Sequence, residues 1–307
     1  MLEFQPVDFR IKELVDSYTF KYGEGSCQHS FVSSFCLNHK YGDMFCERDN
    51  YLYTLRSKLC TPNERIYLFP HGERNGIKSA IQNVIDDAHE HNTRVKFETL
   101  TESAKNLVCE LFPGKFTVEP RRDYSEYIYS TEKLITLEGH AFESKRHDIR
   151  KFFHDYEGRC EIFRILPEHL SLIWDFQEKW LEEKIHTHED IEYKRMLEKE
   201  NYAVQVALNH FFELGLFGIV VFIDGVVCGY NIGSPLNSEC CDGFAEKGDS
   251  SIPNIYKVVR NEFVKKCCTG YKYLNTEEDL GFEGLREMKM MYKPDFMIDK
   301  FIVYENE

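Results

Sequence analysis

Hydrophobic and polar positions recur in a regular order through the first part of the chain. Two β-rich runs flank the dipeptide Asp49-Asn50, a spacing typical of a two-residue hairpin. A further extended run leads through a short loop into a segment whose apolar residues repeat with helical periodicity, and another alternating run follows. The predicted strands cover residues 44–48, 51–55, 65–70 and 94–100, and the predicted helix covers residues 77–88.

The second half of the chain repeats this order of elements. Its hairpin turn is Asp224-Gly225, a dipeptide that readily takes the positive φ angles of a type I′ turn. The predicted strands cover residues 217–223, 226–232, 240–246 and 271–275, and the predicted helix covers residues 253–266. Hairpin, strand, loop, helix and strand therefore occur twice, which predicts two copies of one mixed α/β unit.

The residues between the two copies contain a basic cluster on a predicted helix, residues 145–151. A predicted strand at 159–166 and predicted helices at 167–183 and 189–208 then precede the second hairpin. We therefore expect a first unit at residues 1–125, a connecting basic helical segment at 126–158 and a second unit at 159–307.

Composition places the chain among soluble globular proteins, with 307 residues, 42% hydrophobic and 29% charged. The longest apolar run, residues 214–223, is about half of the ~20 residues that a membrane-spanning helix needs, and the first residues lack the pattern of a secretory signal. The 11 cysteines are odd in number and include adjacent pairs, which favours reduced thiols and a cytoplasmic location. A net charge of −14 argues against nucleic-acid binding by the whole surface but leaves room for a local basic groove.

Most of the candidate chemistry lies in residues 273–294, YLNTEEDLGFEGLREMKMMYKP. A β-rich start, two acids, two glycines and then helix formers predict a strand that ends in a turn and continues as a helix. Such a strand end is where α/β proteins place ligands. The corresponding part of the first copy, FETLTESAK at residues 97–105, has acids but no Gly-x-x-Gly and no Arg and Lys pair. We therefore expect the second unit to carry any chemistry.

Three stretches carry a family resemblance: EYIYSTEKLITLEGHAFESKRHDIRKF at 126–152, residues 244–256, and LNTEEDLGFEGLREMKMMYKP at 274–294. They resemble the bacterial dual-GNAT family that shares its fold with the C-terminal domain of phosphatidylglycerol lysyltransferase, a fold similar to that of Fem-type peptidyltransferases. The resemblance implies an α+β fold, a tandem duplication of the GNAT (acyl-CoA N-acyltransferase) fold in which helices flank a mostly antiparallel sheet in each unit.

The resemblance also implies a function. It predicts transfer of an acyl or aminoacyl group from acyl-CoA or aminoacyl-tRNA to an amine or hydroxyl of a small-molecule or peptide acceptor. The expected cofactor is coenzyme A or acyl-CoA, and no metal is expected. The alternative is a non-catalytic GNAT-like module that binds a ligand or a protein. Oligomeric state stays open.

Acyl transfer to an amine needs proton transfer and stabilisation of an oxyanion. Glu278 and Asp279 are the candidates for binding and deprotonating the amine, although a solvated turn with Asp279 as a helix cap is the structural alternative. Tyr292 is the candidate acid for the leaving group, and a packing role is its alternative.

Basic side chains are the candidates for holding the donor or acceptor. Arg286 and Lys289 lie three residues apart and so share a helix face, where they could equally pair with neighbouring acids. The other predicted substrate-binding residues are Asn275, Lys145, Arg146 and Arg150. For the last three, a solvated helix face is the alternative.

Two loops that enter a predicted helix are candidates for a phosphate cradle, because free backbone amides and a positive dipole end meet there. The candidate cofactor-binding residues are Gly72, Arg74, Gly76, Lys247, Gly248 and Ser250. Neither loop matches the usual acetyl-CoA motif, and in the second loop Pro253 removes a donor while Asp249 adds negative charge. The first loop keeps coenzyme A binding open.

Overall fold

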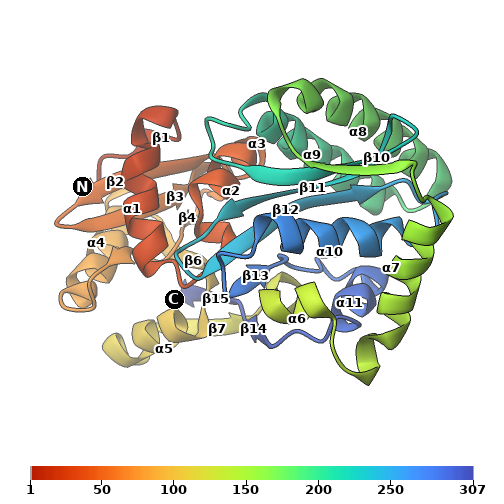
Figure 1. The fold of residues 1–307 in the computed structure, drawn as a ribbon. Coiled ribbons are helices and arrows are strands. Elements are labelled where there is room, and N and C mark those ends of the chain that lie inside the picture. The colour runs from red at the N-terminus through yellow and green to blue at the C-terminus, as the bar shows by residue number, and fades with distance from the viewer. Residues whose placement is uncertain (1, 307) are drawn as a thin grey trace. The chain divides into compact units, whose positions relative to one another are not determined.

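The computed structural model describes residues 2–306, which divide into two compact units (Figure 1). Unit 1 contains the chain up to Tyr127, then Glu277–Met290, and the chain from Phe296 onward. Unit 2 contains Ile128–Thr276 and Met291–Asp295. Among the described residues, no helix combines the length and the apolar character needed to cross a membrane.

Unit 1 is built on one sheet with the strand order β1-β2-β3-β4-β6-β15-β7, and β5 pairs with β3. Its strands are β1 (Gln5–Pro6), β2 (Asp43–Arg48), β3 (Tyr51–Arg56), β4 (Glu64–Tyr67), β5 (His71–Gly72), β6 (Arg94–Leu100), β7 (Phe116–Pro120) and β15 (Phe301–Glu305). The short strand β14 (Phe296–Ile298) precedes β15 and is not part of this sheet. Its helices are α1 (Lys12–Tyr22), α2 (Phe31–Cys36), α3 (Asn38–Tyr41), α4 (Ile77–Glu90), α5 (Glu102–Leu111) and α11 (Glu283–Met290), with short 3-10 turns η1 (Phe9–Ile11), η2 (Cys27–His29), η3 (Ser57–Leu59) and η4 (Arg122–Tyr124).

Unit 2 is built on a sheet in which strands follow the order β8-β13-β12-β11-β10-β9. Its strands are β8 (Glu126–Ser130), which begins at the end of unit 1, β9 (Cys160–Arg164), β10 (Phe217–Ile223), β11 (Val226–Pro235), β12 (Cys240–Gly248) and β13 (Tyr273–Asn275). Its helices are α6 (Thr131–Thr136), α7 (Glu143–Asp155), α8 (Pro167–Thr187), α9 (Ile191–Asn209) and α10 (Ile255–Cys267), with the 3-10 turn η5 (His140–Phe142).

The predicted duplication is visible in the topology of the two units. In unit 1, α4 connects β4 to the parallel strand β6, and in unit 2, α10 connects β12 to the parallel strand β13. The two hairpins that precede these crossovers turn on residues with positive φ, 54° and 62° at Asp49 and Asn50, and 51° and 77° at Asp224 and Gly225. The tandem α+β fold with mainly antiparallel sheets is therefore confirmed.

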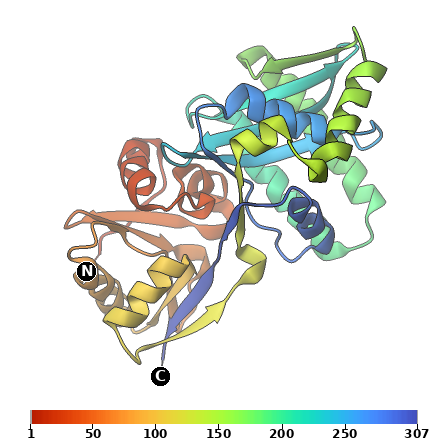
Figure 2. The same ribbon diagram turned by 60° about the horizontal axis from the view of Figure 1, so that its bottom comes forward.

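The structure divides the chain differently from the expected boundaries. The last strand, β15, does not extend the second sheet but pairs antiparallel with both β6 and β7 in unit 1. Figure 2 shows this strand, dark blue, beside β7, yellow. Residues 277–290 also belong to unit 1, whereas the sequence assigned them to the second copy. The physical reason is burial: Val303 of β15 is fully buried in the core that α4 and β6 form.

This inserted strand generates a stability prediction. Val303→Asp places a charge in the core of unit 1, and we expect the free energy of unfolding to fall by about 4 kcal/mol or more. The matched control is Val226→Asp, because Val226 is 67% exposed at the start of β11. Denaturant unfolding followed by circular dichroism measures both, and equal losses for the two variants would contradict the central position of β15.

Candidate functional site

The turn that follows β13 is held by a buried carboxylate, that of Asp279. Its backbone is unusual, with positive φ angles of 62° at Glu277 and 52° at Leu280 on either side. The amide of Leu280 donates to the carbonyl of Asp123 (2.9 Å), and the amide of Gly281 donates to Oδ1 of Asp279 (2.9 Å). The turn is thus attached to residues of the preceding part of unit 1, and α11 begins directly after it.

Three side chains donate to Asp279. Arg286 in α11 donates through Nε (3.0 Å) and Nη2 (2.8 Å), Arg122 donates through Nη1 (3.1 Å), and the hydroxyl of Tyr127 donates as well. Burial would raise the pKa of Asp279, but the hydrogen bonds from Arg286 and Tyr127 outweigh it and lower the pKa to about 2. The carboxylate is therefore ionised and surrounded by donors, which suits an anchor for α11 better than a base.

The other basic residues of this turn also have internal partners. The ammonium group of Lys289 donates to the carbonyls of Glu277 (3.1 Å) and Glu278 (2.7 Å), and Arg286 donates to Asp123 (2.7 Å) in addition to Asp279. The carboxylate of Glu278 differs, because it forms no hydrogen bond with the described residues. Of the two predicted bases, Glu278 is thus the one with free acceptor capacity.

Tyr292 lies in unit 2, in a different group of residues. Its buried ring is flanked by two cations, with Cζ of Arg260 4.5 Å and Nζ of Lys145 4.8 Å from the ring centroid. Arg260 is paired with Glu246 (2.9 Å), and Lys145 donates to the carbonyl of Met291 (3.0 Å). Burial raises the pKa of Tyr292, so its hydroxyl keeps its proton at neutral pH.

The remaining predicted substrate-binding residues lie at several places in unit 2. Arg146 donates to the carbonyl of Gly139 (2.9 Å), so it fastens the chain before α7, and Arg150 is exposed on that helix. Asn275 is buried at the end of β13, opposite Asp242 in β12. Of these three, only Arg150 is open to a large ligand.

The predicted cofactor residues of unit 2 are occupied by protein contacts. Lys247 is paired with Glu200 (2.6 Å), and Ser250 contacts Glu183 (3.2 Å). The loop amides are used as well: Ser251 donates to the carboxylate of Asp249 (2.9 Å). The amide of Asp249 itself donates to the carbonyl of Cys228 (2.9 Å), and that of Ile252 to the carbonyl of Asp249 (3.0 Å). Gly248 packs closely on α10, where a Cβ would come 3.0 Å from Ile255. This loop therefore offers few free donors to a phosphate.

The corresponding loop of unit 1 is ordered by Tyr51. Its hydroxyl lies 2.5 Å from the carbonyl oxygen of Glu73 and 2.8 Å from that of Asn75. Gly72 accommodates this ring, since a Cβ there would come within 2.3 Å of it, and Gly76 takes a φ of 96° before α4. Arg74 is exposed. Coenzyme A binding by these three residues stays a prediction.

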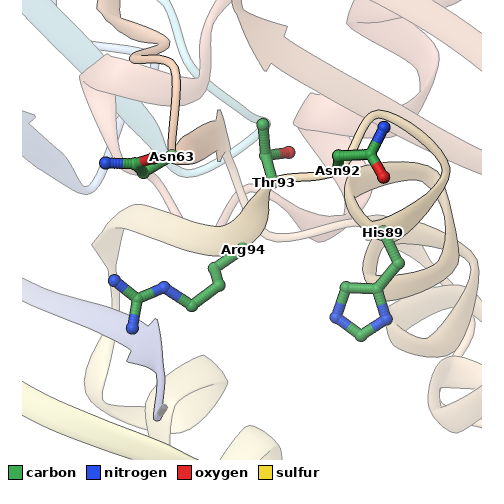
Figure 3. A pocket seen from close by; sticks show the side chains of 5 residues that line it. All are labelled: Asn63, His89, Asn92, Thr93 and Arg94. Atoms are coloured by element: carbon green, nitrogen blue, oxygen red, sulfur yellow. The ribbon is translucent and has the colours of Figure 1, made fainter.

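A surface hollow of unit 1 lies apart from all predicted residues. Its lining consists of Asn63, His89, Asn92, Thr93 and Arg94 (Figure 3). Nε2 of His89 lies 3.0 Å from the carboxylate of Glu305, so part of this lining already has a partner.

The sequence did not predict the residues that surround Asp279 and Tyr292. Arg122 and Tyr127 are more than 150 positions from Asp279 in sequence, and Arg260 lies inside a helix that its apolar pattern alone identified. The charged run RRDY at 121–124 was the one available signal for Arg122.

Comparison with known proteins now adds to this geometry. The model of the family described as phosphatidylglycerol lysyltransferase, C-terminal, matches residues 20–304. The chain belongs to this family. A conserved protein of unknown function from Bacteroides thetaiotaomicron has a similar structure, 25% identical, with a TM-score of 0.91 over 100% of both chains.

More distant structures share the fold. L-PGS from Bacillus licheniformis is 14% identical, with a TM-score of 0.68 over 98% of this chain and 92% of its own. FemX is 10% identical, with a TM-score of 0.51 over 99% and 98%. An uncharacterized protein of Mycoplasmoides gallisepticum is 22% identical over 200 residues, which is 64% of this chain and 62% of that protein's length. The predicted family and its relation to Fem-type proteins are confirmed.

The Asp279 network predicts a pH dependence of stability. Because the folded-state pKa of Asp279 is about 2, below its ordinary value of 3.8, its contribution is present above about pH 4 and is lost as the pH falls toward 2. We expect wild-type protein to lose about 2 kcal/mol relative to Asp279→Asn between about pH 5 and pH 2.

Denaturant unfolding across this pH range measures the difference. The control is Asp224→Asn, which removes an exposed aspartate paired with Arg159 and suits the hairpin turn equally well. Parallel stability curves for wild type and Asp279→Asn would contradict the network.

Proposed function

We propose that this protein transfers an aminoacyl group from aminoacyl-tRNA to an amine or hydroxyl acceptor. The observation that carries the proposal is the group around Tyr292, in which Lys145 and Arg260 flank a phenol that forms no hydrogen bond with the described residues. Membership of a family named for a lysyltransferase supports the reaction class.

The transfer needs an acid for the leaving ribose oxygen. In the reaction the acceptor nitrogen or oxygen attacks the ester carbonyl, the bond to the ribose oxygen breaks, and that oxygen takes up a proton. Tyr292 suits this role because burial raises its pKa, so the proton is available at neutral pH. The charges of Lys145 and Arg260 favour the phenolate that remains. The acceptor nitrogen or oxygen releases its own proton to water.

The choice of donor rests on the two loops. A pyrophosphate needs several consecutive free amides at a helix start, and in unit 2 those of Asp249, Ser251 and Ile252 are already bonded. Acyl-CoA therefore remains the alternative donor, through the loop of unit 1 alone. Lys145 and Arg260 are buried, so the predicted basic residue that suits a phosphodiester backbone is Arg150, which is exposed on α7.

A non-catalytic binding module is the second candidate. The internal pairing of Asp279, Arg286 and Lys289 favours it, because three of the residues predicted to act on substrate stabilise the turn instead. The two candidates differ in turnover: a binding module retains its ligand but transfers nothing.

The donor is tested by a gel shift with aminoacylated tRNA at several salt concentrations. We expect binding that weakens with salt, and about tenfold weaker binding with a smaller salt slope for Arg150→Met, because Arg150 is exposed on α7 and one phosphate contact is lost. Lys151→Met is the matched control, since Lys151 is the next residue on the same helix, equally exposed, but paired with Asp155 (3.0 Å). Tight binding of acyl-CoA with no shift of tRNA would overturn the assignment of the donor.

A further inference from the structure

Unit 1 contains a buried polar cluster that the proposed reaction steps leave unused. It lies where η2, β2, β3, β5 and β6 meet, and its members are buried. They are Gln28, His29, Asp43, Arg56, His71 and Thr99. Two contacts connect them: Nε2 of His71 lies 3.3 Å from Nδ1 of His29, and Nη2 of Arg56 donates to the carbonyl of Gln28 at 3.4 Å.

The buried guanidinium of Arg56 has only long hydrogen-bond and ion-pair distances to its acceptors. Its side chain is 2% exposed, yet its nearest acceptor is the Gln28 carbonyl at 3.4 Å, and the carboxylates of Asp43 and Glu98 are each 3.7 Å away. Its Nε has no hydrogen-bond partner. Buried guanidinium groups normally have close, bonded partners, because an unpaired buried charge costs several kcal/mol. One face of the guanidinium stacks on Tyr41, with Cζ 4.1 Å from the ring centroid, while Nε stays without a hydrogen-bond partner among the described residues.

Other groups in the cluster are unpaired in the same way. Neither the amide oxygen nor the amide nitrogen of Gln28 has a partner, although the residue is 5% exposed. Oδ1 of Asp43, Nδ1 of His71 and the hydroxyl of Thr99 also lack partners. Buried polar atoms are bonded in the large majority of cases, so a concentration of exceptions indicates a missing binding partner.

Backbone strain coincides with this cluster. Thr99 has a φ of 54° within β6, a conformation that is a genuine outlier for a β-branched residue. Such strain persists where surrounding structure enforces it, and it is concentrated at binding sites. Here it coincides with the buried hydroxyl of Thr99, which has no hydrogen-bond partner among residues 2–306.

The charge balance selects the kind of ligand. Burial lowers the pKa of Arg56, but the charge of Asp43, followed by Tyr41, Glu98 and Glu278, outweighs it and raises the pKa. Burial lowers the pKa of His71 to about 4, so this residue adds no positive charge at neutral pH. Two carboxylates, those of Asp43 and Glu98, thus lie 3.7 Å from one guanidinium, and Gln28 and Arg56 hold donors without partners among the described residues.

We propose that this cluster binds a primary ammonium group next to a carbonyl or carboxylate oxygen, the chemistry shared by a free α-amino acid and a peptide N-terminus. Asp43 and Glu98 supply acceptors for the ammonium group, and Arg56 and Gln28 supply donors for the oxygen. This inference rests on the proposed function, because it names the chemical class of the acceptor in the proposed transfer.

Calorimetric titration of the full-length protein tests the proposal with four kinds of probe. They are the L-α-amino acids, short dipeptides, simple primary amines without a carbonyl, and N-acetylated amino acids. We expect binding of amino acids or dipeptides, at least tenfold weaker binding of simple amines, and no binding of acetylated forms. Tighter binding of amino acids indicates a free amino acid as the ligand, and tighter binding of dipeptides indicates a peptide N-terminus.

Gln28→Met and Gln177→Met form a matched pair of variants. Gln177 is equally buried but fully bonded, with Asn201 at 2.8 Å and Tyr230 at 2.5 Å. Gln177→Met removes the amide that pairs with Asn201 and Tyr230 and leaves these two buried groups without that partner, so the melting temperature of this variant falls by several degrees. Without ligand, the melting temperature of Gln28→Met stays the same or rises. Gln28→Met weakens probe binding at least tenfold, and Gln177→Met leaves it unchanged.

Two results overturn the proposal: no probe binds the wild type, or binding persists in Gln28→Met. A high-resolution crystal structure soaked with the best probe that shows water alone at Gln28 overturns it as well. The proposed function and the proposed binding site are refuted by different results. Amino acid binding without any transfer from tRNA refutes the function alone, and transfer with an acceptor KM unchanged in Gln28→Met refutes the binding site alone.

Discussion

The ionic network around Asp279 is the constraint on which the candidate chemistry of unit 1 depends. Two arginines and a tyrosine from η4, β8 and α11 converge on one buried carboxylate, and the backbone amide of Gly281 completes its set of donors. Removing one partner of such a network leaves charges without compensation, a loss of several kcal/mol. The turn can therefore hold positive φ angles on both sides of Asp279, and it fixes Glu278 and the start of α11.

The distribution of hydrogen bonds separates residues that stabilise the fold from residues that remain free for a ligand. Asp279, Lys289 and Lys247 have their bonding capacity filled by protein groups. Arg56 and Gln28 are just as buried but hold donors and acceptors without partners. Because a buried polar group is stable only when bonded, the first set explains rigidity and the second set points to binding.

Sequence patterns predicted the local elements well. Asp49-Asn50 and Asp224-Gly225 identified both hairpins because a two-residue turn with positive φ has few alternatives, and the apolar repeat of residues 77–88 identified α4. The helix α1 was missed, since its apolar residues form only a weak stripe and just Val15 and Thr19 are buried. The motif at 273–294 was correctly seen as a turn between a strand and a helix.

The same sequence patterns could not predict which distant strands and side chains pair with one another. The insertion of β15 between β6 and β7 depends on contacts across some 200 positions, and alternation in five residues does not say which sheet receives them. In the same way, the acids and bases of residues 273–294 were visible, but their partners Arg122 and Tyr127 were not. The sequence thus identified chemistry-bearing residues without showing which of them are already paired.

The most direct test is single-turnover transfer from tRNA carrying a labelled amino acid, with wild type compared with Tyr292→Phe and with Tyr271→Phe, a half-buried tyrosine that stacks on Phe217. The account predicts that wild type and Tyr271→Phe move the label to an acceptor amine, and that Tyr292→Phe does so about 10² times more slowly while still binding the tRNA. Label that stays on tRNA with wild-type protein, or equal rates for Tyr292→Phe and wild type, would contradict it.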